Sequence, residues 1–379
     1  MIPLILFSCS QHNSEVEGYY HKIDISNRHV QKSQVEFSSI LDNKSLKFIA
    51  LETTEDCLIG SIEKVLFHDG YYYILDRNMS QMIYKFNKEG EFIQKIGKQG
   101  NGPGEYTMPM DFCIGHNNNI VILDNGYYIT KFTSEGKHIA QQQLKDFAAN
   151  GIERIQNGYA FIGGGESDNL VITNKDFSKV DSFFSYQNPN ASRLILSPLQ
   201  HIHENLIIYR RFLDDTIYRI KNNQPVPHVV LSYENSAKPN ISTTRKQFKK
   251  QLRQAKLIKS YYETEDDVFM MIADKGEPFL LFYHKPTRAK KFFSYFDLVN
   301  DVSFDNQTSY VIGSDPKTDR FIFYIQPENI DSGKFKITDV QSETVKSQIR
   351  EILQKVDKHS NPILLLADIK LNKPQNENK

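Results

Sequence analysis

Residues 97–141 read GKQGNGPGEYTMPMDFCIGHNNNIVILDNGYYITKFTSEGKHIAQ, and this stretch decides the fold. It begins with a glycine-rich segment, Gly97–Glu105. Four short apolar runs follow, at Met110–Ile114, Ile120–Leu123, Tyr128–Phe132 and His138–Ala140. Tight polar turns such as Asp124-Asn125-Gly126 separate them. Short apolar runs joined by such turns are typical of one antiparallel four-stranded sheet.

The same order of runs occurs immediately upstream, between Ile62 and Ile96. Its members are Ile62–Leu66, Tyr71–Leu75, Met82–Phe86 and Phe92–Ile96. Leu75-Asp76 corresponds to Leu123-Asp124 at the end of the second run of each unit. A repeat of about 40–50 residues with four strands per unit is typical of β-propeller blades, because one such sheet cannot bury its own faces. The sequence therefore predicts an all-β ring of four-stranded antiparallel blades.

A resemblance to a known family rests on the glycine-rich segment. The pattern is Gly97-x-x-Gly100-x-Gly102-Pro103-Gly104-Glu105-Tyr106, followed by Pro109, and it resembles an NHL-type repeat. Residues 46–141 are more closely similar to the six-bladed β-propeller lipoproteins of Bacteroides-type bacteria, and the resemblance returns at residues 361–366. It implies a six-bladed propeller in the cell envelope. It implies no activity, because most members of that family have none established.

Less regular units continue the pattern toward the C-terminus. We expect four further blades, within residues 152–184, 194–231, 268–304 and 309–337. Six blades need about 270–300 residues, which fits within the 379 residues of the chain. We therefore predict a single six-bladed propeller domain over residues 19–371, followed by a polar tail at 372–379.

Two segments interrupt the strand pattern. Residues 243–259 have apolar positions at Phe248, Leu252 and Ala255, a helical spacing, and are rich in basic residues. This inserted helix either lies solvated on the propeller or touches an anionic surface. Residues 342–356 predict a C-terminal helix that packs outside the ring.

Residues 363–371 should form the strand that closes the ring. Ile363–Leu366 is apolar without alternation, as expected of a strand covered on both faces. It lies too near the C-terminus to begin a new blade. Its partners should therefore come from the N-terminal region Tyr20–Leu51 or from the sixth unit.

The N-terminus reads MIPLILFSCS. Leu6-Phe7-Ser8-Cys9 resembles a bacterial lipobox, which implies a lipid on Cys9. Residues 1–18 would then be the remnant of a signal peptide followed by a tether. This interpretation predicts a lipid-anchored protein of the bacterial cell envelope, either periplasmic or on the outer-membrane surface. The alternative is an apolar N-terminus without lipid.

Composition limits the remaining function classes. Lys+Arg and Asp+Glu both number 46, so the formal net charge is zero, which argues against a nucleic-acid-binding surface. Cys9, Cys57 and Cys113 provide neither a disulfide framework nor a zinc spacing. We expect free buried thiols at Cys57 and Cys113, the alternative being a bridge between them. A monomer is expected.

The sequence offers little catalytic chemistry. His201-x-His203 is the only close histidine pair, and on a strand the two could ligate one metal from the same face. No third ligand is evident, so calcium and zinc are unsupported and no cofactor is predicted. Neither G-x-S-x-G nor H-E-x-x-H occurs.

Four polar residues follow equivalent strands and should share one rim of the propeller: Asp76, Arg77, Asp124 and Asn125. They are candidate ligand-binding residues, because recognition commonly lies on loops of a rigid scaffold. The alternative is that both carboxylates accept hydrogen bonds from local backbone N–H groups. We favour a binding module for a glycan, peptide or partner protein. A propeller enzyme, such as a lactonase-like hydrolase or a lyase with a central metal, is the alternative.

Overall fold

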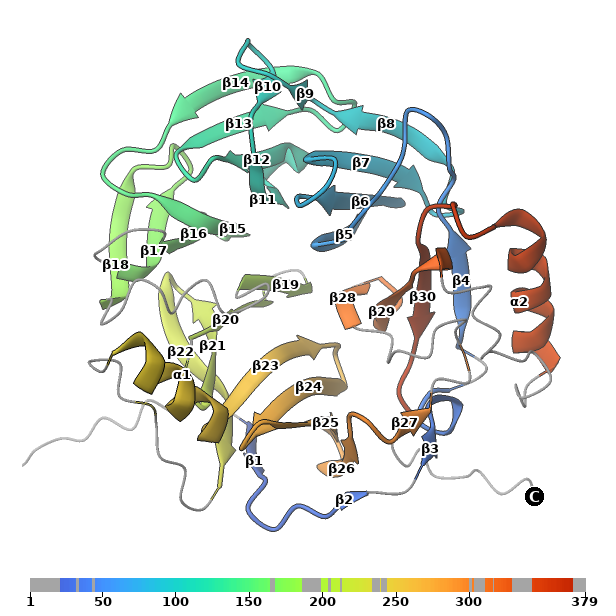
Figure 1. Ribbon diagram of the computed structural model, residues 1–379. Helices are drawn as coiled ribbons and strands as arrows, with labels where there is room; N and C mark the ends of the chain where they lie inside the picture. The colour runs from blue at the N-terminus through green and yellow to red at the C-terminus, as the bar shows by residue number, and fades with distance from the viewer. Residues whose placement is uncertain are drawn as a thin grey trace, which may run out of the picture.

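The computed structural model describes residues 21–370, apart from residues 32–33, 43–44, 164–167, 186–198, 204–205, 212, 234–238, 240–243, 300–301, 303–310, 316 and 329–342. Its strands form six blades around a central axis (Figure 1). The fold is the predicted six-bladed β-propeller of four-stranded antiparallel sheets with two α-helices. Cys9, the rest of residues 1–18 and the tail at 372–379 lie outside the described residues.

Each blade runs outward from its first strand at the axis. Blade 1 consists of β5 (Lys64–His68), β6 (Tyr71–Asp76), β7 (Met82–Asn87) and β8 (Phe92–Ile96). Blade 2 consists of β11 (Pro109–Ile114), β12 (Ile120–Asp124), β13 (Tyr128–Phe132) and β14 (His138–Gln143), and the 3-10 turn η2 (His116–Asn118) joins its first two strands. Blade 3 consists of β15 (Ala149–Ile155), β16 (Gly158–Gly163), β17 (Asp168–Asn174) and β18 (Lys179–Ser185). Blade 4 consists of β19 (Leu199–His203), β20 (Leu206–Arg210), β21 (Thr216–Lys221) and β22 (Gln224–Ser232). Blade 5 consists of β23 (Lys256–Glu263), β24 (Asp267–Asp274), β25 (Glu277–His284) and β26 (Ala289–Ser294). Blade 6 consists of β28 (Val311–Asp315), β29 (Arg320–Ile325), β30 (Ile363–Ala367) and β4 (Lys47–Ala50).

Blade 6 closes the ring with strands from both ends of the chain. β30 pairs antiparallel with β29 on one side and with β4 on the other, so both expected sources supply a partner. Every residue of β30 is buried, which explains why its sequence lacks alternation. The strand ends at Ala367, and Ile369 only forms an isolated bridge to Leu41.

The N-terminal segment adds strands to the outer edges of several blades. We call residues 21–50 the N-terminal strap, because they run along the outer edges of blades 4, 5 and 6 (Figure 1). Its strand β1 (His21–Asp24) pairs parallel with β22, and β2 (Val30–Gln31) pairs parallel with β26. The 3-10 turn η1 (Phe37–Ser39) follows β3 (Val35–Glu36), which pairs parallel with β27 (Leu298–Val299). Blades 4 and 5 therefore have five strands.

The glycine-rich segment crosses from blade 1 to blade 2, as its sequence indicates. Within it, β9 (Lys98–Gln99) pairs parallel with β10 (Glu105–Tyr106). Gly97 has φ +70°, and a Cβ there would lie 2.7 Å from the rings of Phe132 and Tyr106. The buried hydroxyl of Tyr106 donates to the carbonyl oxygen of Ile96 at 2.8 Å. Glycine at position 97 therefore allows the backbone to turn beside these two rings, where any side chain would clash with them.

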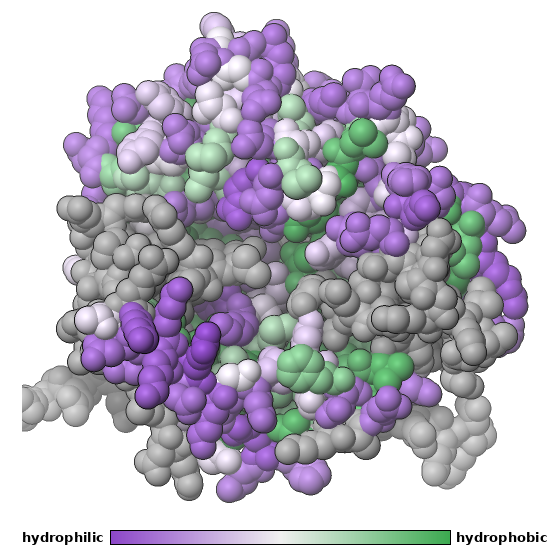
Figure 2. Space-filling view, in the orientation of Figure 1, coloured by the Kyte–Doolittle hydropathy of each residue, from purple (hydrophilic) through white to green (hydrophobic). Residues whose placement is uncertain are grey.

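The inserted helix is shorter than the predicted 243–259. The helix α1 spans Arg245–Gln254 and begins with a capping box between Thr244 and Gln247. Lys256–Lys259 already belongs to β23, so the fifth blade starts earlier than the predicted Val268. The start of this strand was not recognised because its lysines extend the basic run of the helix. Figure 2 shows α1 covered with hydrophilic residues. Residues 194–196, where the predicted fourth blade begins, and residues 335–337, where the predicted sixth blade ends, lie outside the described residues.

The C-terminal helix α2 spans Glu343–Lys355 and lies outside blade 6 (Figure 1). Val345, Ile349 and Ile352 form its buried face against the core of that blade. None of the helices in the described part of the chain is long and apolar enough to cross a membrane. Cys57 and Cys113 are buried free thiols.

Candidate functional site

The innermost strands of the blades lie around the axis (Figure 1), and four of them carry charged or titratable residues. Lys64 lies on β5, Asp111 on β11, Glu153 on β15 and His201 on β19. These strands belong to four successive blades, so the four residues are distant in sequence. The closed ring, rather than any local motif, places them together.

Lys64 joins the first three of these blades. Its Nζ donates to Oδ1 of Asp111 at 2.9 Å, to Oε1 of Glu153 at 2.8 Å and to the carbonyl oxygen of Phe112 at 2.7 Å. Oδ2 of Asp111 also accepts a hydrogen bond from the backbone N–H of Ile152 at 2.9 Å. An ammonium has three donors. All of them are used here, which fixes both carboxylates.

This cluster contains one cation and two carboxylates. Burial opposes the charge on Lys64, but Asp111 and Glu153 raise the pKa of its ammonium, so it stays protonated. Burial raises the pKa of Glu153, and although Lys64 opposes the shift, Asp111 adds to it. The environment of Glu153 therefore favours its protonated form more than water does.

His201 approaches the same cluster from blade 4. Its Nδ1 lies 3.9 Å from Oε2 of Glu153. The pairing of β19 with β20 shifts register between His201 and His203, so this stretch departs from the simple alternation on which the predicted shared metal site depends. No group of three or more His, Cys, Asp or Glu side chains in the described ranges is placed to hold a metal ion.

A cavity of about 780 Å³ opens beside this cluster. It lies on the face formed by the turns after the first and third strands of the blades, which we call the hairpin face. Nε2 of His68 is buried and has no hydrogen-bond partner among the described residues. The lining of this axial cavity includes Phe67, His68, Tyr71, Lys88, Glu153 and His201.

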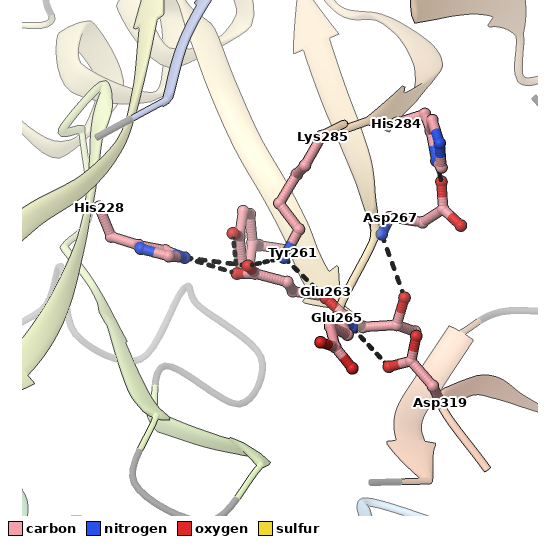
Figure 3. Close-up of polar contacts among 9 residues, drawn as sticks. His228, Tyr261, Glu263, Glu265, Asp267, His284, Lys285 and Asp319 are labelled. Atoms are coloured by element: carbon pink, nitrogen blue, oxygen red, sulfur yellow. Dashed lines mark hydrogen bonds and ion pairs between the residues drawn. The ribbon is translucent and has the colours of Figure 1, made fainter. Parts of the chain in front are cut away.

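A second buried carboxylate lies between blades 4 and 5 (Figure 3). Glu263, at the end of β23, is fully buried. It accepts hydrogen bonds from Nε2 of His228 at 2.9 Å, from Nζ of Lys285 at 2.6 Å and from the hydroxyl of Tyr261. Nζ of Lys285 also donates to the carbonyl oxygen of Thr264 at 2.8 Å. Three donors from two blades therefore hold this carboxylate in place.

The pKa values of two neighbouring carboxyl groups in this region are shifted in opposite directions. Burial opposes the ionisation of Glu263, but the hydrogen bonds from His228 and Lys285 lower its pKa to about 2. Burial raises the pKa of Asp267 to about 6, although Nδ1 of His284 lies 2.9 Å from its Oδ1. Glu263 is therefore a permanent anion near neutral pH, and Nε2 of His228 carries a hydrogen to donate to it.

The sequence-predicted ligand residues lie on the opposite face. Asp76 and Asp124 end β6 and β12, and both are buried. Each carboxylate accepts hydrogen bonds from two backbone N–H groups, at 2.7–3.0 Å. Arg77 donates to the carbonyl oxygen of Met110 at 3.2 Å, and Asn125 occupies a turn with φ 51°. Ligand binding by these four residues stays a prediction.

Sequence reasoning missed the buried charges at both clusters. One signal could have found them, namely a charged residue directly beside large apolar residues of a strand. Asp111 stands between Met110 and Phe112, and Glu263 follows Tyr261-Tyr262. Such residues are rarely buried unless they are paired. Their partners could not have been identified, because these come from other blades.

The closed ring of six blades defines the protein as a six-bladed β-propeller. It has buried ion pairs near its axis and cavities on one face. The chain belongs to the family described as Domain of unknown function (DUF4934), which matches residues 20–368. No curated protein matches its sequence.

Solved structures agree with the fold. A Bacteroides fragilis protein named as an exported protein superposes with a TM-score of 0.77 at 22% identity, covering 92% of this chain and 100% of that chain. The WD40 domain of Pan2 from Neurospora crassa gives a TM-score of 0.39 at 9% identity, covering 82% of this chain and 77% of that chain. The first likeness supports the fold alone, and the second is too weak to support an argument.

Proposed function

We propose that this protein is a monomeric binding module of the bacterial cell envelope, whose ligand, a glycan, occupies the axial cavity. The observation that carries the proposal is the open cavity of about 780 Å³ on the hairpin face. Its size lies within the roughly 300–1,000 Å³ of typical small-molecule sites. Phe67 and Tyr71 offer aromatic rings to the apolar faces of a sugar, and His68 and Lys88 offer polar groups to its hydroxyls.

Binding explains the axial chemistry better than catalysis does. Lys64 is paired with both Asp111 and Glu153, and its hydrogen bonds hold the two carboxylates in fixed positions. His68, in contrast, lines the cavity, and its Nε2 has no hydrogen-bond partner among the described residues. A hydrolase or lyase with a central metal would need converging ligands in addition to these paired groups.

A glycan microarray tests the binding proposal. We expect the purified protein to retain a subset of glycans and His68→Ala to lose at least tenfold in affinity for them, since His68 lines the cavity. His138→Ala is the matched control, because Nε2 of His138 is also buried without a partner among the described residues but lies outside the cavity lining. Absence of retained glycans, or equal losses in both variants, would contradict the proposal.

The envelope location rests on two observations. Leu6-Phe7-Ser8-Cys9 resembles a lipobox, and a structural relative is named as an exported protein. We propose that Cys9 carries lipid and that residues 10–18 tether the propeller. In the native host, Cys9→Ser should move the protein from the membrane fraction to the soluble fraction, because stable attachment requires the acyl chains. Ser8→Ala is the control and should stay with membranes. A Cys9→Ser protein that sediments with membranes would end this proposal.

A further inference from the structure

A second cavity, of about 670 Å³, lies on the hairpin face where blades 3, 4 and 5 meet. We call it the junction cavity. Its lining includes the first-strand turn of blade 3, the third-strand turn of blade 4 and the Glu263 cluster of blade 5. Arg154 lines both this cavity and the axial cavity, so the two are neighbours.

The lining of the junction cavity has an excess of positive charge. Among the described residues that line this cavity, four side chains are cationic at neutral pH and one, that of Glu263, is a carboxylate. The four cations are Arg154, Arg219, Lys221 and Lys285. The chain as a whole has no net charge, so this local excess is not a general property of the surface. An excess of one sign in a concave site attracts a ligand of the opposite sign.

Glu263 does not neutralise the cations of the described lining. Glu263 is fully buried and already accepts hydrogen bonds from Tyr261, His228 and Lys285 (Figure 3). Its low pKa shows that these donors satisfy it as an anion. Its role is therefore to fix Lys285 in the cavity wall, where the ammonium uses two of its three donors on Glu263 and Thr264.

Arg219 supplies a donor that the described protein does not use. It lies on β21, and its Nε is buried without a hydrogen-bond partner among the described residues. A buried guanidinium N–H that loses water and gains no partner is costly. The side chain of Arg219 also lines the cavity, and a guanidinium forms strong charge-assisted hydrogen bonds with carboxylate and sulfate oxygens.

We propose that the junction cavity binds a small hydroxylated organic anion, namely an acidic sugar, with Arg219 and Lys285 holding its carboxylate or sulfate. The amide side chains of Gln156, Asn222 and Asn223 also line the cavity and match the hydroxyl groups of such a ligand. This inference goes beyond the proposed function, because it concerns a different cavity with a different chemistry. It holds or fails independently of glycan binding at the axis.

Ligand-observed NMR titration at low ionic strength provides the test. The probes are D-glucuronate, D-glucose 6-sulfate and neutral D-glucose. We expect one of the two acids to bind at least tenfold more tightly than glucose, and added salt to weaken that binding, because salt screens charge attraction. The preferred acid identifies the anionic group. Equal binding of all three probes, or no binding of either acid, would overturn the proposal.

Variants of the same protein locate the bound acid. Arg219→Gln should lower its affinity at least tenfold, and Arg219→Lys should lower it less, because lysine retains the charge but not the planar fork. Arg350→Gln, on the exposed side of α2 and outside both cavity linings, is the control and should bind like the wild type. His68→Ala should also retain the acid, which separates this cavity from the axial one. Unchanged affinity in folded Arg219→Gln would refute the site.

Discussion

A chain that ends at Ser360 should not fold cooperatively. Removing residues 361–379 deletes β30, the strand between β29 and β4. Blade 6 would then lose the ladder that joins the two ends of the chain. Its remaining strands would present unpaired edges, which favour aggregation.

The energy of this strand is comparable to the stability of a whole domain. Ile363, Leu364, Leu365 and Leu366 are all buried, and burial of four large aliphatic side chains contributes roughly 6–12 kcal/mol before entropy costs. Native domains are stable by only about 5–15 kcal/mol. Loss of this contribution therefore suffices to unfold the ring.

Asn361 adds a polar connection that the deletion also removes. Its Oδ1 accepts a hydrogen bond from the backbone N–H of Ile59 at 2.8 Å, and its Nδ2 donates to the carbonyl oxygens of Glu52 at 2.7 Å and Cys57 at 2.6 Å. These contacts join the start of β30 to the segment that enters blade 1. The shortened chain would leave their backbone groups without these partners.

Urea denaturation and limited proteolysis measure this effect. The protein lacking residues 361–379 should be insoluble, or soluble and rapidly cleaved, without a cooperative transition. Deletion of residues 373–379 is the matched control, because it leaves every described residue in place, and it should unfold like the full chain. A shortened protein that unfolds cooperatively would show that β30 is dispensable.

Replacement of Lys64 by methionine should destabilise the protein by about 3–5 kcal/mol at pH 7. This is the usual cost of removing one partner of a buried ion pair, since the remaining charge keeps its desolvation penalty. Here two carboxylates, Asp111 and Glu153, lose their shared cation at once. Glu153 is the more deeply buried of the two and should account for most of the loss.

The pH dependence of Lys64→Met identifies the cause. Without Lys64, the pKa of Glu153, which burial already raises, should rise further. A carboxyl group whose folded-state pKa exceeds its unfolded value stabilises the fold as the pH falls toward that unfolded value. The deficit of Lys64→Met should therefore be largest at neutral pH and smaller near pH 5, as measured by urea denaturation at both pH values.

A compensating substitution provides the control for this prediction. Glu153→Gln in the Lys64→Met background removes the buried unpaired charge while keeping the side-chain volume. The double variant should regain a substantial part of the lost stability and should show less pH dependence than Lys64→Met alone. A double variant that is less stable than Lys64→Met would mean that the hydrogen bonds, rather than the charge, carry the effect.

The blades with the strongest sequence signals were predicted best. In blades 1 and 2, tight turns such as Asp124-Asn125-Gly126 separate short apolar runs, so local chemistry determines strand boundaries. The observed strands β6 and β12 agree with the predicted Tyr71–Leu75 and Ile120–Leu123 within one residue. The closing strand could also be predicted, because complete burial leaves a continuous apolar run.

Other features had no local signal. The strap strand β2 has two residues, too few for a period, and its parallel partner lies in another blade. The hydrogen bonds of Lys64 and Glu263 likewise join residues of different blades. The sequence suggested a site at Asp76 and Asp124 because those residues repeat visibly. The two buried clusters depend on how successive blades are rotated about the axis, which a linear pattern does not contain.

The N-terminal strap determines when the protein can finish folding. Its strands β1 and β4 leave the ribosome first, yet their partners β22 and β30 follow only after more than half of the chain. Contacts between residues so far apart in sequence form slowly, because the intervening chain must first be ordered. β4 in particular waits for β30 near the C-terminus. Ring closure is therefore a late event, and the growing chain must keep an apolar edge strand from pairing with other molecules until synthesis ends.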